Sequence, residues 1–143
     1  MTDTQIVRRF AVVTLIVYAA VAAVTMILQA VANYESGAGL GLVTIIVPAL
    51  EAGQTQARRT GQALDGARMW KLSGIFGLVS LVLSSALAFA ASLVLGLNEI
   101  AQMMAGAAPG QLALFALVVL AIYILAGRLF LGFGQRLELN RRS

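Results

Sequence analysis

Few side chains in this sequence could carry out chemistry. The chain contains no histidine and no cysteine. The commonest general base, the commonest metal ligand and any thiolate nucleophile are therefore missing. The sequence also has no phosphate-binding glycine loop, carboxylate pair or metal-ligand spacing. We therefore predict no catalytic residue, no metal site and no cofactor, and we expect that the chain is not an enzyme.

Glu51 is the strongest remaining candidate because it falls inside a largely apolar stretch. An ionisable group within a membrane span is costly and is a functional hypothesis by default. Its depth is similar to that of Arg128, so an ion pair between the two is possible, and Arg58 is a competing partner two turns along the same helix face. Two interpretations stay open. Glu51 is either paired, or hydrated near the cytoplasmic headgroups, and fixes helix register, or it is a substrate or proton site.

Several other polar residues lie in or beside apolar stretches. Tyr18 and Tyr123 lie well inside theirs, and each hydroxyl needs an acceptor, which predicts contacts between helices. Arg128 could instead extend to the membrane interface without a partner, and Trp70 suits an interfacial anchor. A basic cluster could bind lipid headgroups or an acidic partner surface, or could serve only to set topology. This cluster is Arg58, Arg59, Arg68 and Lys71.

The elements that must position these residues are four apolar stretches. The 143 residues are 60% hydrophobic and 11% charged, whereas a soluble domain is about 25% charged. Each stretch is long enough for a helix to cross a hydrocarbon layer of about 30 Å. We predict an all-α integral membrane four-helix bundle, a single transmembrane domain over residues 1–143. The predicted spans are 10–32, 36–60, 72–97 and 111–133.

The basic residues predict the orientation of this bundle. All ten lysines and arginines lie on one side of the four-stretch pattern, and the connections 33–39 and 98–110 contain none. They are Arg8, Arg9, Arg58, Arg59, Arg68, Lys71, Arg128, Arg136, Arg141 and Arg142. Basic side chains stay on the cytoplasmic face during insertion, so both termini are expected in the cytoplasm (N-in/C-in).

The second stretch differs from the others. Its purely apolar part is only Leu40–Leu50, and Pro48 predicts a kink because it cannot donate to the carbonyl one turn earlier. Gly37-x-x-x-Gly41 is a small-residue contact motif in it. Gly61 favours a helix end, and Asp65 favours the cap of the next helix.

The third stretch carries a stripe of small residues at helical spacing. Such a stripe lets another helix approach closely, and whether that helix belongs to the same chain or to another is left open. The stripe is Ser73, Gly77, Ser80, Ser84, Ala88, Ser92 and Gly96.

One block of the sequence resembles a known family. Pro48-Ala49-Leu50-Glu51-Ala52-Gly53-Gln54, followed by Arg58-Arg59-Thr60-Gly61 and Trp70, is similar to a block in small proteobacterial inner-membrane proteins predicted to span four times. The resemblance implies a bacterial inner-membrane location and brings no catalytic role. Small multidrug exporters also have four spans and one membrane carboxylate. They match poorly, because their essential glutamate lies in the first span, which has no carboxylate here.

Two functions are compatible with these features. The first is a non-enzymatic accessory or scaffolding component of a membrane assembly, in contact with lipids and with other membrane subunits or its own copies. The second is a small oligomeric transporter or channel that uses Glu51. The basic balance is explained by the membrane edge, so we expect no nucleic-acid partner.

Overall fold

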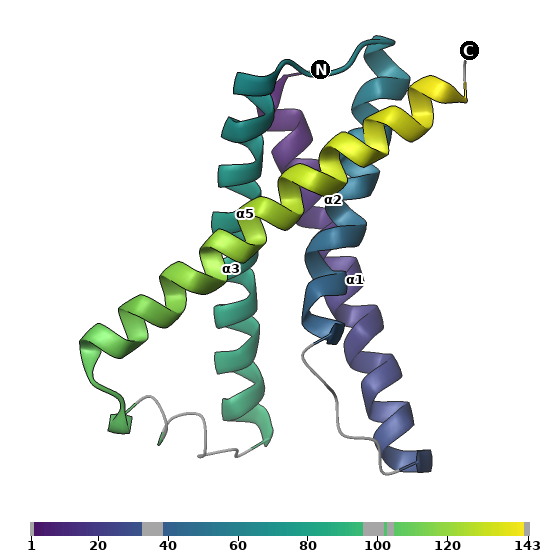
Figure 1. The fold of residues 1–143 in the computed structure, drawn as a ribbon. Helices are drawn as coiled ribbons and strands as arrows, with labels where there is room; N and C mark the ends of the chain where they lie inside the picture. Colours follow the sequence, from purple (N-terminus) through teal and green to yellow (C-terminus); the bar gives the residue numbers. More distant parts are fainter. Residues whose placement is uncertain (1, 33–38, 96–101, 103–104, 142–143) are drawn as a thin grey trace.

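The computed structural model describes residues 2–32, 39–95, 102 and 105–141, without the side chains of residues 39–41, 91, 94 and 95. Within this part of the chain the regular structure is helical (Figure 1). The four long helices are α1 (Asp3–Ala32), α2 (Gly39–Thr60), α3 (Gly66–Leu95) and α5 (Pro109–Asn140). The prediction of an all-α fold is confirmed.

Three of the four helices are long and apolar enough to cross a membrane. They are α1, α3 and α5, judged by length and composition. Helix α2 does not meet the same criterion, because its second half carries Glu51, Gln54, Gln56 and two arginines. Pro48 lies inside α2, and the helix continues on both sides of it. The crossing by α2 and the kink at Pro48 therefore stay predictions.

The helices extend beyond the predicted spans at one end. Helix α1 begins at Asp3 instead of residue 10, α3 at Gly66 instead of residue 72, and α5 ends at Asn140 instead of residue 133. The prediction followed the apolar runs, but backbone hydrogen bonding does not stop where side chains become polar. The predicted ends at residues 36 and 97 lie outside the described residues.

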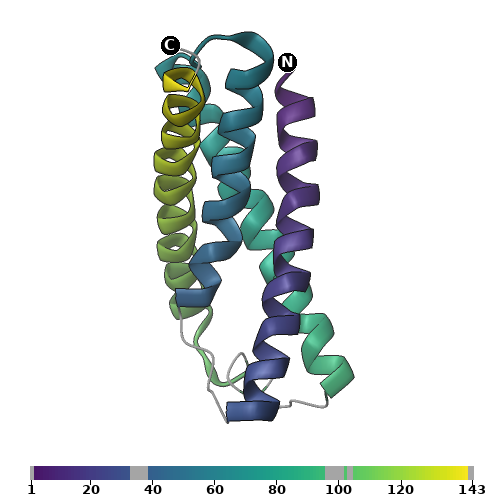
Figure 2. The ribbon, with the colours of Figure 1, turned by 90° about the vertical axis from the view of Figure 1, so that its right-hand side faces the viewer.

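These helix extensions meet at the end of the bundle that also holds the N-terminus, the α2–α3 connection and the C-terminal end of α5 (Figures 1 and 2). We call it the charged end. Gly61, with φ of 68°, ends α2 as predicted, and its N–H donates to the Ala57 carbonyl at 2.8 Å. The Asp65 carboxylate accepts the Arg68 N–H at 2.7 Å and caps α3 as predicted.

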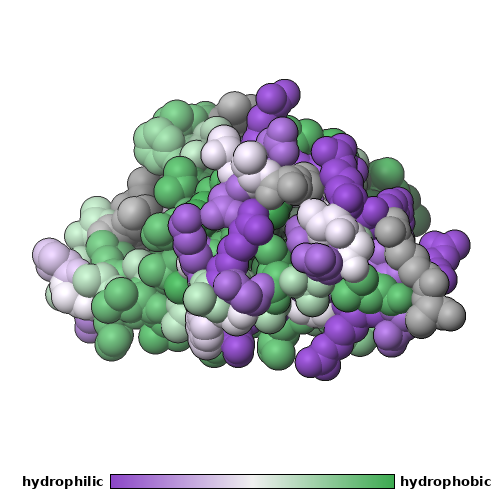
Figure 3. Space-filling model, turned by 90° about the horizontal axis from the view of Figure 1, so that it is seen from above, coloured by the Kyte–Doolittle hydropathy of each residue, from purple (hydrophilic) through white to green (hydrophobic). Residues whose placement is uncertain are grey.

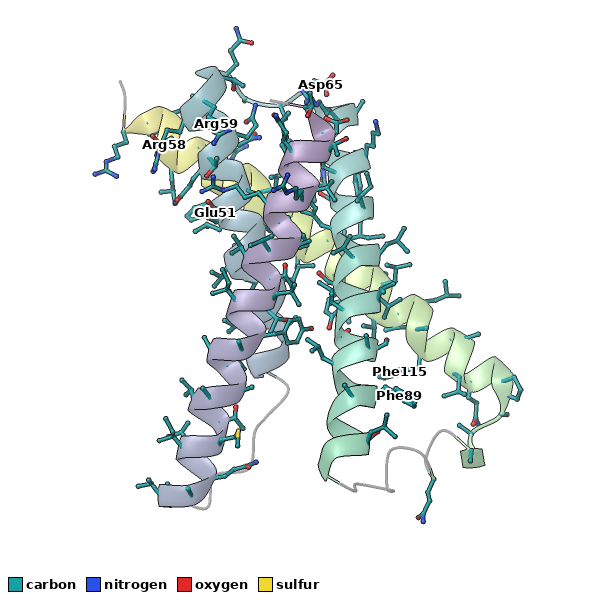
Figure 4. All side chains as sticks on the ribbon, turned by 180° about the vertical axis from the view of Figure 1, so that it is seen from behind. Glu51, Arg58, Arg59, Asp65, Phe89 and Phe115 are labelled. Atoms are coloured by element: carbon teal, nitrogen blue, oxygen red, sulfur yellow. The ribbon has the colours of Figure 1, made fainter. Side chains whose placement is uncertain are left out.

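The core of the bundle lies in the half nearest the charged end. In α1 the buried residues are Ile6, Phe10 and Thr14. The rings of Phe10 and Phe76 stack at a centroid distance of 3.9 Å and join α1 to α3. Further along, side chains such as Phe89 in α3 and Phe115 in α5 are exposed (Figure 4). Packing within the chain is therefore concentrated in one half of the helices.

Helix α5 crosses α2 at glycines (Figure 1). A Cβ atom added to Gly53 would collide with the Leu131 carbonyl oxygen, and one added to Gly134 with the Leu50 carbonyl oxygen. The two backbones are therefore in direct contact. The predicted Gly37-x-x-x-Gly41 motif stays a prediction, because Gly37 lies outside the described residues and the surroundings of Gly41 are not described.

Candidate functional site at the charged end

Glu51 in α2 is bound by Arg9 of α1 and by Thr55 (Figure 4). Its Oε1 accepts from Arg9 Nη2 at 2.6 Å and Nε at 2.8 Å, and from the Thr55 hydroxyl at 2.8 Å. Its Oε2 is buried and has no hydrogen-bond partner in the described structure. The Glu51 side chain is 28% exposed. The carboxylate thus joins α1 to α2 by a charge-assisted hydrogen-bonded pair.

This partner corrects the sequence analysis, which expected Arg128 or Arg58. Arg9 was assigned only a role in topology, because it precedes the first apolar stretch. Helix α1 begins at Asp3, however, so residues before the apolar stretch remain helical and Arg9 faces α2. The signal that was available is helical periodicity continued toward the N-terminus.

Arg58 forms its ion pair with Glu138 of α5. Arg58 Nη2 lies 3.1 Å from Glu138 Oε2, and Arg58 Nε donates to Oε1 at 3.3 Å. The Glu138 side chain is 9% exposed, so its charge is almost withdrawn from solvent. Glu138 was not a candidate, because it lies past the last apolar stretch. It is the second contact, after the glycines, that holds α2 against α5.

The guanidinium of Arg128 lies over the ring of Trp70, 4.2 Å from the ring centroid. This distance is typical of a cation–π contact. Sequence analysis assigned both residues to the membrane boundary but did not bring them together. The contact joins the start of α3 to the middle of α5.

Asp3 binds two members of the predicted lipid-binding cluster. Its carboxylate oxygens accept from Arg68 Nε at 2.7 Å and from Lys71 Nζ at 3.0 Å. These hydrogen bonds, first from Arg68 and then from Lys71, lower the pKa of Asp3, which precedes the predicted span at residue 10. With Arg58 also paired, three of the four cluster residues have a carboxylate partner; the fourth, Arg59, is exposed.

Two buried glutamines connect α2, α5 and the α2–α3 connection. Gln135 Nε2 donates to Gln56 Oε1 at 3.0 Å, and Gln135 Oε1 accepts the Leu64 N–H at 3.3 Å. Gln56 Nε2 then donates to the Thr60 hydroxyl at 3.0 Å. A buried amide is costly unless it is satisfied, and this pair is satisfied. Sequence analysis missed Gln135, whose position four residues past Leu131 on the same helix face was the available signal.

Tyr18 lies apart from these pairs. The Tyr123 hydroxyl has Tyr18 of α1 and Ser84 of α3 as electrostatic neighbours. The neighbourhood of the two tyrosines is compatible with the contacts between helices predicted for them. The candidate residues do not gather around one common partner: Glu51 binds Arg9, Arg58 binds Glu138, and Arg128 lies on Trp70.

Seen from above, hydrophilic side chains are spread among hydrophobic ones at the charged end (Figure 3). A groove of about 520 Å³ lies between α5 and the start of α3, lined by Met69, Arg128, Gly132 and Arg136 among others. No group of three metal-ligating residues occurs in the described ranges. Over the described residues, the arrangement at this end is a set of ion pairs beside an open groove.

Together, the fold and these contacts define a class: an all-helical protein with three helices suited to crossing a membrane. Comparison with protein-family models, curated proteins and solved structures finds no match. The resemblance to small proteobacterial four-span proteins therefore stays a prediction from the sequence.

Proposed function

We propose that this chain is a non-enzymatic integral membrane protein that acts as an accessory or scaffolding component of an assembly in the bacterial inner membrane. In this proposal all four long helices cross the membrane, and both termini lie in the cytoplasm. The gathering of the described basic residues at the charged end supports this orientation, because basic residues are retained on the cytoplasmic side.

The contacts of α2 support a fourth crossing in spite of its polar residues. Polar groups in a bilayer must be satisfied within the protein. Glu51 faces Arg9 of α1, and Gln56 is buried against Gln135 of α5. The polar side of α2 is thus turned toward other helices, while Val47 and Leu42 on another side are about two-fifths exposed. A helix of this kind is compatible with a bundle in lipid.

The single observation that carries a scaffolding role is the small-residue stripe of α3. Ser73, Gly77 and Ser80 are buried within the chain, but Ala88, further along the stripe, is exposed. The Ser92 hydroxyl donates to the Phe89 carbonyl of its own helix at 2.7 Å. A small-residue surface of this kind lets a second helix approach closely. We propose that a helix of another copy or of another membrane protein packs there.

Photo-crosslinking from single cysteines tests this proposal, since the chain has none of its own. A benzophenone maleimide on Ala88→Cys should give a crosslinked protein band in native membranes. Ala86→Cys is the matched control, because it is also exposed and lies about 200° around the same helix. Equal crosslinking from both positions, or lipid adducts alone from Ala88→Cys, would remove the scaffolding role.

The geometry favours this role over transport through Glu51. Arg9 and Thr55 both bind Oε1 of Glu51, so a cation that used this oxygen would have to displace the Arg9 guanidinium. The decisive assay is proton- or cation-driven flux in proteoliposomes. Flux that is present in the native chain and lost in Glu51→Gln would establish the transporter instead.

A further inference from the structure

The groove between α5 and the start of α3 has a charge that the chain itself does not balance. Arg128 and Arg136 line it, and in the described structure neither forms an ion pair. Three carboxylates of this end are in ion pairs with other basic residues: Asp3 with Arg68 and Lys71, Glu51 with Arg9, and Glu138 with Arg58. The fourth, Asp65, accepts the Arg68 N–H and caps α3. The groove therefore presents two uncompensated guanidinium groups.

Arg128 has unused hydrogen-bonding capacity at this place. Its Nε is buried and has no hydrogen-bond partner within the described residues. Its guanidinium carbon is held over Trp70 at 4.2 Å from the ring centroid, so the side chain is already oriented. An oriented guanidinium suits bidentate binding of phosphate oxygens.

The apolar part of the groove suits a lipid. Gly132 keeps it open, because the nearest atom to a Cβ added there is Met69 Sδ at 3.7 Å. Leu129 and Phe133 flank it and are 67% and 53% exposed. Cationic groups next to exposed apolar side chains match a phosphate group joined to acyl chains, whereas a free anion would need no apolar wall.

We propose that this groove binds the headgroup phosphate of an anionic phospholipid from the leaflet at the charged end, between Arg128 and Arg136. The proposal is independent of the scaffolding role and depends only on insertion of α3 and α5 in a membrane. The proposed lipid site differs from the basic cluster predicted from the sequence. Three residues of that cluster, Arg58, Arg68 and Lys71, are paired with carboxylates.

Trp70 is the single tryptophan of the chain and lies against Arg128, so its fluorescence reports on this groove. The protein is reconstituted in vesicles of equal parts phosphatidylglycerol and phosphatidylcholine. Bromine atoms, which quench tryptophan, are placed on the acyl chains of one lipid or of the other. Stronger quenching by brominated phosphatidylglycerol is expected, and equal quenching by both lipids would overturn the proposal.

Substitutions test which residues cause the preference for phosphatidylglycerol. Each basic group near an anionic lipid contributes about 1 kcal/mol, so Arg136→Gln and Arg128→Gln should each reduce the relative affinity for phosphatidylglycerol about five-fold. Arg136 is exposed, which makes loss of the fold in its variant unexpected. Arg59→Gln removes the same charge at the same end and should have no such effect. An equal loss in Arg59→Gln would show general surface attraction and overturn the assigned site.

Two further measurements test whether binding depends on the shape of the groove and whether the ligand is a lipid or a free anion. Gly132→Val places a branched side chain in the groove without changing charge and should weaken the preference. Gly74→Val is its control, since nothing lies within 4 Å of the Cβ position of Gly74. If Gly132→Val leaves the preference for phosphatidylglycerol unchanged, the groove is not the lipid site. The preference for phosphatidylglycerol is also measured with inorganic phosphate and with sodium chloride at equal ionic strength. Loss of the preference with phosphate alone would assign the site to a free anion instead of a lipid.

Discussion

Gly53 of α2 and Gly134 of α5 have equivalent roles at the crossing of their helices. Each glycine faces a backbone carbonyl of the other helix, Leu131 for Gly53 and Leu50 for Gly134. The obstacle on both sides is backbone, which cannot move aside as a flexible side chain can. The crossing brings Gln56 to Gln135 and Arg58 to Glu138, so the polar contacts of α2 depend on it.

Replacing Gly134 by alanine should destabilise the bundle. The new methyl group would overlap the Leu50 carbonyl oxygen, and overpacking of this kind costs about 1–3 kcal/mol. The free energy of unfolding in detergent, followed by circular dichroism, measures the effect. Gly74→Ala is the control: it faces open space, and alanine in place of glycine should stabilise α3 by up to about 1 kcal/mol. Equal effects of the two changes would contradict the close crossing.

Replacing Gln135 by leucine should open the α2–α3 connection. The substitution leaves the buried Leu64 N–H and Gln56 Oε1 without partners, and each unsatisfied group costs about 1–3 kcal/mol. Faster tryptic cleavage after Arg59 would show the opening. The double variant Gln56→Leu, Gln135→Leu should recover part of the loss, because it removes one of the orphaned groups. A double variant less stable than the sum of the single ones would contradict the pair.

A double-mutant cycle should detect the Arg9–Glu51 pair. Arg9→Gln leaves an unpaired carboxylate near the membrane and should cost more than Glu51→Gln. Groups in direct contact show coupling energies of about 0.5–3 kcal/mol, whereas separate groups add. Glu51→Gln combined with Arg128→Gln should therefore be additive within about 0.5 kcal/mol. Coupling to Arg128 without coupling to Arg9 would restore the pairing first expected from the sequence.

The lowered pKa of Asp3 predicts a dependence of stability on pH. A carboxylate whose folded pKa is below its ordinary value of 3.8 stabilises the fold fully above that value and loses the contribution as pH falls through the folded pKa. The difference in unfolding free energy between the native chain and Asp3→Asn should therefore be constant near neutral pH and shrink below about pH 3.8. A difference that grows on acidification would exclude the pairs with Arg68 and Lys71.

Single cysteines test the proposed orientation. In intact cells, a cysteine at Glu35 or Glu99 should react with an impermeant maleimide from the periplasmic side. A cysteine at Asp65, in the α2–α3 connection, should react only after the membrane is opened. Labelling of Asp65→Cys and Glu35→Cys from the same side would mean that α2 does not cross.

Helix type and number were accessible to prediction, but helix ends and partners were not. Apolar runs predicted four helices, and the conformational preference of Gly61 predicted the end of α2. They failed for Arg9 and Glu138, which lie in helical extensions outside the runs and are bound to Glu51 and Arg58. An apolar run shows which residues face lipid or the protein core. The end of a helix is set instead by the partners of its terminal backbone N–H and C=O groups.

The sequence alone determines the properties that depend on local order: helical structure, apolar length, and the grouping of every basic residue on one side of the pattern. The tertiary structure decides which residues meet. Arg128 lies on Trp70 instead of Glu51, and Gln56 meets Gln135, because the glycine crossing sets how far α5 is rotated and shifted against α2. That rotation arises from packing between segments far apart in the sequence, so the periodicity within one segment does not predict it.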